Sequence, residues 1–222
     1  MRYNRYMMTD YPKYKDVRAK YKIENEDFEV KVADNIFTKD EYDTIYKIWD
    51  NIPEEKTIVR DWSGHKIFWA NLPKNIEDVI LKSAENIIGE ELILAEYSLA
   101  RYSEEFGYKR KLFPHYDNRP SQRVTFDIQL KADEPWAVVV EGIPYYIKDN
   151  QALVFTGTQQ MHWREDKELN PDSKTDMIFC HLAYKKDRPL QDDYLDAMEE
   201  RSGVLLRETN ISNKIEKLDI DA

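Results

Sequence analysis

Residues 110–131 read RKLFPHYDNRPSQRVTFDIQLK and contain the clearest β-strand pattern of the chain. From Arg123 to Leu130, apolar and polar side chains alternate. The polar members are Thr125, Asp127 and Gln129. Because strand side chains point alternately to opposite sides, one face of this strand should pack on a core, while the other meets either water or a polar interior. The His115-Tyr116-Asp117 motif just before the strand favours the polar interior.

Further short segments on both sides have strand character and are separated by turn residues such as Pro120, Gly142 and Gly157. The candidate strands are residues 92–102, 110–117, 123–131, 136–140, 143–147, 151–156, 159–164 and 175–184. Many short strands with turns between them are typical of sandwiches and jelly rolls. We therefore expect a mainly β fold with flanking helices, either a sandwich or a jelly roll.

Two helices are predicted ahead of this region. Thr38-Lys-Asp-Glu41 is a capping box, and the apolar side chains that follow it recur at helical spacing up to Pro53. Residues 75–88 have the same periodicity and stop at Gly89. We expect both helices to pack on one sheet. A short strand is expected near residues 28–32, and residues 54–74 should be loop with one short strand around 67–69.

The length of 222 residues predicts one domain with a substantial core. Its expected parts are an irregular N-terminal arm (1–26), a helical support (27–91), the jelly-roll core (92–186) and a charged C-terminal extension (187–222). Short helical pieces are expected at 194–199 and 215–218. The sequence carries no signal for an oligomeric state.

Acidic residues outnumber basic ones, with 43 Asp and Glu against 33 Lys and Arg, giving a formal net charge of -10. This balance argues against non-specific binding to nucleic acid or to anionic membranes. The one cysteine, Cys180, cannot form an intrachain disulfide, which favours a reducing compartment. No apolar run has the length of a signal peptide or of a membrane span. We expect a cytoplasmic protein.

Four histidines are present, and two of them suggest a metal site. On an extended strand, His115 and Asp117 would point to the same face. In a jelly roll, the turn at Gly157 would bring His162 back beside them. Two imidazoles and one carboxylate form the facial triad that holds non-haem Fe(II) and leaves positions open. The other two histidines are expected in structural places, His181 in an apolar core strand and His65 in a loop.

Arg164 lies two residues after His162 and should share its side of the strand. A guanidinium one step deeper than the metal is suited to pairing with a carboxylate of a co-substrate.

Three motifs in this order resemble the 2-oxoglutarate/Fe(II)-dependent dioxygenases, with most likeness to the prolyl-hydroxylase-like branch. They are LFPHYDN (112–118), RVT (123–125) and the block from LVFTG (153–157) to HWRE (162–165). The resemblance spans roughly residues 92–184 and implies a double-stranded β-helix (jelly roll). It implies that His115, Asp117 and His162 hold Fe(II), and that 2-oxoglutarate and O2 are consumed while succinate and CO2 are released. Ascorbate is an optional addition.

The resemblance also implies roles for further residues. Tyr102 stands where the family often has a tyrosine that bonds to 2-oxoglutarate. Asp117 favours hydroxylation, because halogenases of the family replace this carboxylate. The family often places a basic residue about ten positions after the second histidine, where it binds the distal carboxylate of 2-oxoglutarate. Here Lys174 lies twelve positions after His162, so both Lys174 and Arg164 are candidates for this role.

The substrate is not legible, and a peptide or a small molecule both fit. Two other classes of protein stay open. A cupin-like metal enzyme that does not use 2-oxoglutarate would share the jelly roll, although such enzymes usually have more histidines. A non-catalytic ligand-binding jelly roll would contain the triad by coincidence, and its lack of iron would distinguish it.

Overall fold

The computed structural model describes residues 28–61, 63–117, 123–165 and 167–187. Within these residues the chain forms a large and a small antiparallel sheet. The order in the large sheet is β1 (Lys31–Ala33), β8 (Gln151–Phe155), β5 (Val124–Ala132), β10 (Thr175–Tyr184), β4 (Leu92–Tyr102), β3 (His65–Phe68) and β2 (Thr57–Arg60). The order in the small sheet is β7 (Ile143–Tyr145), β6 (Val138–Val140) and β9 (His162–Arg164). This mainly β arrangement is consistent with a jelly roll.

Two α-helices precede the central strands, α2 (Lys39–Trp49) and α3 (Lys74–Ile88). The predicted capping box is present at the start of α2, where the backbone N–H of Thr38 donates to Oε2 of Glu41 at 2.8 Å. Gly89 follows the last residue of α3, as expected. Short 3-10 helices cover Glu54–Lys56, Glu104–Phe106 and Lys185–Asp187. None of the described helices is long and apolar enough to cross a membrane.

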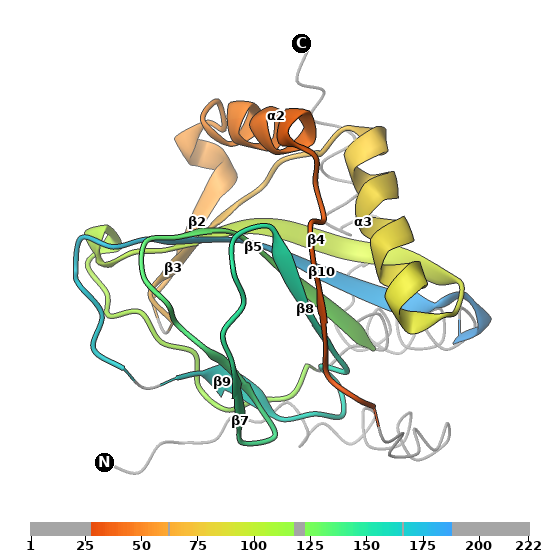
Figure 1. Ribbon diagram of the computed structural model, residues 1–222. Helices are drawn as coiled ribbons and strands as arrows, with labels where there is room; N and C mark the ends of the chain where they lie inside the picture. The colour runs from red at the N-terminus through yellow and green to blue at the C-terminus, as the bar shows by residue number, and fades with distance from the viewer. Residues whose placement is uncertain (1–27, 62, 118–122, 166, 188–222) are drawn as a thin grey trace, which may run out of the picture.

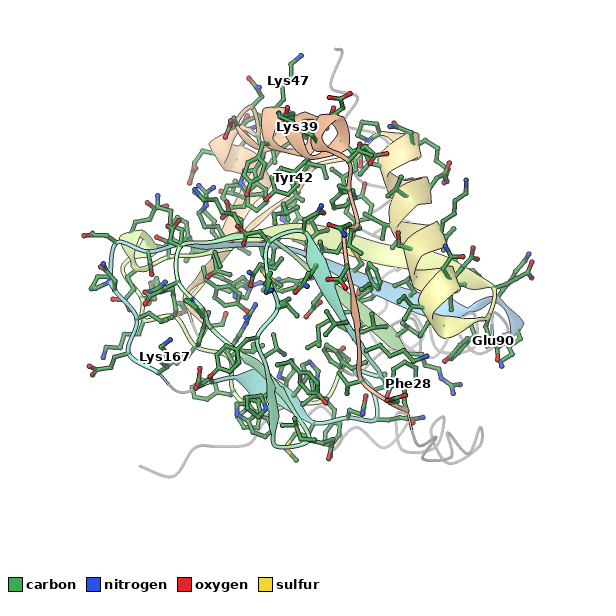
Figure 2. All side chains as sticks on the ribbon, in the orientation of Figure 1. Phe28, Lys39, Tyr42, Lys47, Glu90 and Lys167 are labelled. Carbon is green, nitrogen blue, oxygen red and sulfur yellow. The ribbon has the colours of Figure 1, made fainter. Side chains whose placement is uncertain are left out.

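The helices and the small sheet lie on opposite sides of the large sheet (Figure 1). On the helical side, one buried cluster joins Ile45 and Ile80 of the helices to Phe126 and Ile178 of the strands. Tyr42 lies on the sheet side of α2, whereas Lys47 points away from it (Figure 2). Apolar side chains at helical spacing thus form the contact with the sheet.

A second buried cluster fills the space between the two sheets and includes Leu153, Met177 and Val138. The polar side of β5 faces this interior, because the apolar members of β5 belong to the helical side. Thr125, Asp127 and Gln129 are all buried. Of the two environments that the sequence left open for this face, the structure has the polar interior.

The expected strand at 110–117 is wrong. His115 makes only an isolated antiparallel bridge with His162. Neighbouring backbone groups bond to different segments, since the N–H of Lys111 donates to Ser63 and that of Asp117 donates to Gly157. Pro114 has no N–H to offer. A continuous ladder with one partner strand is therefore not formed.

The prediction for residues 54–74 is also wrong in part. Two strands rather than one form there, and the hairpin of β2 and β3 extends the large sheet beside β4. His65 opens β3 and is buried, although it was expected in a loop. Ile58, with 42% of its surface exposed, and Val59 lie on the edge strand β2, so no burial-driven alternation marks that strand in the sequence. The arm (1–26) and the helical pieces at 194–199 and 215–218 lie outside the described residues.

Candidate metal centre

The residues of the predicted metal site meet where the loop before β5 passes the start of β9. They are His115 and Asp117 from the loop and His162 from β9. One potential ligand atom from each of them lies within 4.8 Å of the other two. The backbones of His115 and His162 exchange two hydrogen bonds, of 3.1 and 3.0 Å, and their rings are 4.2 Å apart. The N–H of Asp117 donates to the carbonyl of Gly157 at 2.8 Å. Backbone pairing therefore brings the two halves of the motif to one place.

Both histidines use Nδ1 for a hydrogen bond to a nearby carbonyl. Nδ1 of His115 lies 2.8 Å from the oxygen of Phe113, and Nδ1 of His162 lies 3.1 Å from the oxygen of Gln160. A carbonyl oxygen only accepts, so the ring proton belongs on Nδ1 and the lone pair on Nε2. This is the tautomer that a metal bound at Nε2 requires, with the ring orientation already fixed.

The carboxylate of Asp117 is held in a similar way. The hydroxyl of Thr125 donates to Oδ2 at 2.9 Å. Oδ1 lies 3.9 Å from Nε2 of His162. Ligands in neighbouring positions around an octahedral metal stand roughly 3 Å apart, so little movement would let both atoms bind one ion. Oδ1 is thus the oxygen that faces the candidate metal position.

The protonation state of His162 also suits metal binding. Burial is the largest influence on His162 and lowers its pKa to about 4, although the charge of Asp117 acts in the opposite direction. Imidazole must be neutral to bind a metal. A carboxylate with two neutral imidazoles, all on one side, is the donor set of non-haem iron sites with open positions. The residues present therefore fit such an ion.

His181 lies beside this cluster, although its apolar neighbours in the sequence predict a place in the core. Its Nε2 is 3.8 Å from Oδ2 of Asp117, and its Nδ1 is 3.1 Å from Oε1 of Glu96. Burial lowers the pKa of His181, but the hydrogen bond to Glu96 and the charge of Asp117 outweigh it and raise the pKa to about 9. His181 stands opposite Thr125 on β5 and opposite Glu96 on β4. The sequence does not show this strand register, which is what places His181 next to Asp117.

Arg164 points into the interior between the sheets and is 3% exposed. Its guanidinium donates to the carbonyl of Trp136 at 2.8 Å and to Sδ of Met177 at 3.3 Å. The guanidinium carbon lies 5.4 Å from the ring of Tyr102 and 4.9 Å from that of Trp136. Tyr102 is fully buried at the end of β4. The structure thus brings together two of the residues expected at the co-substrate site.

Lys174, the other candidate cation, lies elsewhere. Its Nζ is 2.6 Å from Oε2 of Glu105, and both side chains are substantially exposed, at 39% and 44%. Its backbone N–H donates to Asp133 at 2.9 Å. Lys174 immediately precedes β10, but its ammonium group pairs with a surface carboxylate.

A scan of the sequence against models of known families finds no match, and neither does a search of curated proteins. Solved structures do match. HygX from Streptomyces hygroscopicus, with nickel and 2-oxoglutarate bound, has a TM-score of 0.51 and 11% identity over 70% of this chain and 83% of its own. EctD from S. alaskensis, with 2-oxoglutarate and 5-hydroxyectoine, has a TM-score of 0.52 and 12% identity over 69% of this chain and 72% of its own.

A third structure, SnoK, is a non-heme alpha ketoglutarate dependent carbocyclase from nogalamycin biosynthesis. It has a TM-score of 0.53 and 8% identity over 76% of this chain and 83% of its own. At identities this low, the likeness establishes a common fold. The chain therefore has a fold that also occurs in proteins crystallised with 2-oxoglutarate and in a non-heme alpha ketoglutarate dependent carbocyclase.

Proposed function

We propose that this protein is an Fe(II)- and 2-oxoglutarate-dependent dioxygenase built on a double-stranded β-helix, with its motifs favouring the prolyl-hydroxylase-like branch. The observation that carries the proposal is the cluster of His115, Asp117 and His162, in which both Nε2 atoms are free to bind a metal. A coincidental cluster has no need for the hydrogen bonds that fix each ring and the carboxylate in this way.

In this proposal His115, Asp117 and His162 hold Fe(II). Iron and 2-oxoglutarate, when bound, supply the oxidative chemistry that consumes O2 and releases succinate and CO2. The chain itself keeps His162 neutral, orients both imidazoles through backbone carbonyls and aims Oδ1 of Asp117 at the ion. Ascorbate would serve only to keep the iron reduced.

The co-substrate assignment is supported by HygX and EctD, whose structures contain 2-oxoglutarate, and by the buried cation next to the cluster. We assign the distal carboxylate to Arg164, with Tyr102 beside it, because this guanidinium lies in the interior and can form a bidentate pair. Lys174 is the less suitable candidate for this role, because its ammonium group pairs with Glu105 at the surface.

We further propose that the reaction is the hydroxylation of a peptide or small molecule. This part rests on the presence of Asp117, which leaves no position for a halide. The carbocyclase SnoK shows that the fold also hosts a reaction other than hydroxylation. A mass-spectrometric screen of peptide and metabolite libraries for a product with one added oxygen atom would identify the substrate.

The proposal is tested by metal binding and by turnover of the co-substrate. We expect purified protein to bind one Fe(II) under anaerobic conditions and, once O2 is admitted, to convert 2-oxoglutarate slowly to succinate. His115→Ala and Asp117→Ala should lose both properties. Asp172→Ala is the matched control, because Asp172 is exposed and lies outside the cluster.

Each negative result would favour a different alternative to the proposed function. Protein that binds no iron would be the non-catalytic jelly roll. Protein that binds iron but neither binds nor turns over 2-oxoglutarate would be the cupin-like enzyme. Stoichiometric iron in both alanine variants would show that the metal site lies elsewhere.

A further inference from the structure

Three polar side chains of β5 point into the interior between the sheets. The outer two, Thr125 and Gln129, have hydrogen-bond partners. Thr125 donates to Asp117 at 2.9 Å, and the amide of Gln129 donates to the carbonyl of Ile147 at 3.0 Å. Asp127 lies between them and is 8% exposed. Within the part of the chain that the structure describes, its Oδ1 is buried and has no hydrogen-bond partner.

A buried carboxylate oxygen without a partner costs free energy, so native proteins rarely keep one without a reason. Asp127 is the middle member of a face on which Thr125 and Gln129 both make hydrogen bonds. A ligand that enters this interior can provide the missing partner.

The strand register gives the position of Asp127 relative to the two ends of the proposed co-substrate site. At one level, Thr125 stands opposite His181, and both contact Asp117. Two levels further along, Gln129 stands opposite Met177, whose sulfur accepts a hydrogen bond from Arg164. Asp127 occupies the level between these two. A molecule that reaches from the metal cluster to Arg164 must therefore pass beside it.

We propose that Asp127 is a specificity-determining residue of the co-substrate site, where it binds a dicarboxylate ligand as a neutral carboxylic acid that donates a hydrogen bond to the ligand. This inference rests on the function proposed above and assigns a residue that function does not use. An ionised Asp127 would repel a dianion in a water-poor interior, so a protein molecule in which Asp127 is ionised must take up one proton from solvent when it binds the ligand.

The surroundings of Asp127 make this proton available near neutral pH. Burial raises the pKa of Asp127 to about 7, and the negative charge of Asp117 acts in the same direction, whereas the charges of His181 and Arg164 oppose it. Cys180 of β10 and Tyr102 of β4 are two further titratable groups that interact with this carboxyl group. A divalent metal at Asp117 favours the ionised form of Asp127, and the arriving dianion reverses that preference.

The test is calorimetry of 2-oxoglutarate binding to nickel-loaded protein, in which no turnover occurs. Titrations in two buffers of different ionisation enthalpy count the protons taken up. For the wild type we expect an uptake that approaches one proton above pH 7, and a Kd that rises by up to about tenfold per pH unit there. Asp127→Asn has the same shape and keeps a donor without a titrating proton. Its uptake should vanish, and its Kd should change far less with pH.

The matched control is Asp176→Asn, since Asp176 is a buried carboxylate of β10 that faces the helical side, where it pairs with Arg101. This variant should keep the proton uptake and the pH dependence of the wild type. Wild-type binding without proton uptake, or the same pH dependence in Asp127→Asn, would overturn the inference while leaving the proposed function intact. The first measurement needs no variant, so it holds even if Asp127→Asn fails to fold. A wild type that does not bind 2-oxoglutarate would overturn the proposed function and this inference with it.

Discussion

The carboxylate of Asp117 lies so close to Gly157 that no side chain fits at position 157. A Cβ on Gly157 would overlap Oδ2 of Asp117 and lie 2.7 Å from its Cγ. The two residues are also joined by the hydrogen bond from the N–H of Asp117 to the carbonyl of Gly157. The absence of a side chain at position 157, rather than an unusual backbone angle, lets the carboxylate take its place in the cluster.

Replacing Gly157 by Ala should therefore displace the carboxylate of Asp117. We expect Fe(II) affinity to fall by roughly 10- to 100-fold, the usual cost of disturbing a group that orients a ligand. Anaerobic titration with Fe(II), with circular dichroism as a check of folding, measures this loss.

Gly107→Ala is the control for that experiment. Gly107 has a φ of +83° and open space around its Cα, so alanine there should cost about 1–2 kcal/mol of stability without affecting metal binding. Wild-type iron affinity in a folded Gly157→Ala protein would contradict the assigned position of Asp117.

Thr125 offers a second test of the same carboxylate. Valine matches threonine in shape but removes the donor to Oδ2 of Asp117, whereas serine keeps it. We expect Thr125→Val to weaken Fe(II) binding by roughly tenfold and Thr125→Ser to stay near the wild type. Equal affinities of the two variants in the same titration would mean that this hydrogen bond does not position the ligand.

A third prediction concerns stability in acid. His65 is 5% exposed, and its Nδ1 lies 2.6 Å from Oγ of Ser63. Burial, with smaller contributions from the charges of Arg60 and Arg164, lowers the pKa of His65 to about 3. The unfolded chain, with an ordinary pKa of about 6.5, binds a proton more readily, so stability is lost as pH falls from about 6.5 towards 3.

Urea unfolding at pH 7 and at pH 5 measures this effect. Between these two values the wild type should lose about 2 kcal/mol more than His65→Gln, which lacks the titrating group. The other groups that titrate in this range are common to both proteins and cancel in the comparison. An identical loss in both proteins would show that His65 does not bind its proton more weakly in the folded state.

Features that depend on neighbouring residues in the chain could be predicted from the sequence. The alternation from Arg123 to Leu130 correctly indicated β5 and its two faces, and the capping box at Thr38 and Glu41 correctly indicated the start of α2. Both signals are local, because side-chain alternation and capping need no knowledge of distant contacts.

Features that depend on which strands pair could be predicted only where the expected jelly roll implied them, as for His162 beside His115. Residues 110–117 have strand-like composition, but their hydrogen bonds go to several segments, so no strand forms. His181 has apolar neighbours in the sequence, and only the pairing of β10 with β5 and β4 places it next to Asp117. The same holds for Asp127, whose unpartnered oxygen is visible only in three dimensions.

The two candidate cations give the last prediction. Arg164 is buried at the interior end of the site, whereas Lys174 pairs with Glu105 at the surface. Loss of a buried, hydrogen-bonded charge typically costs about 2–5 kcal/mol, so Arg164→Met should raise the Kd for 2-oxoglutarate by roughly 30-fold or more. Lys174→Met should change it little, and nickel binding should stay the same in both.

Calorimetry on nickel-loaded protein measures these effects, and thermal melts show whether each variant is folded. Arg164→Lys is the milder variant, because it keeps the charge but loses the planar fork that pairs with a carboxylate. Its Kd for 2-oxoglutarate should lie between those of the wild type and Arg164→Met. A larger effect of Lys174→Met than of Arg164→Met would reverse the assignment. If neither change weakens binding, both residues are excluded, and Arg123 and Lys131 at the two ends of β5 are the next cations to test.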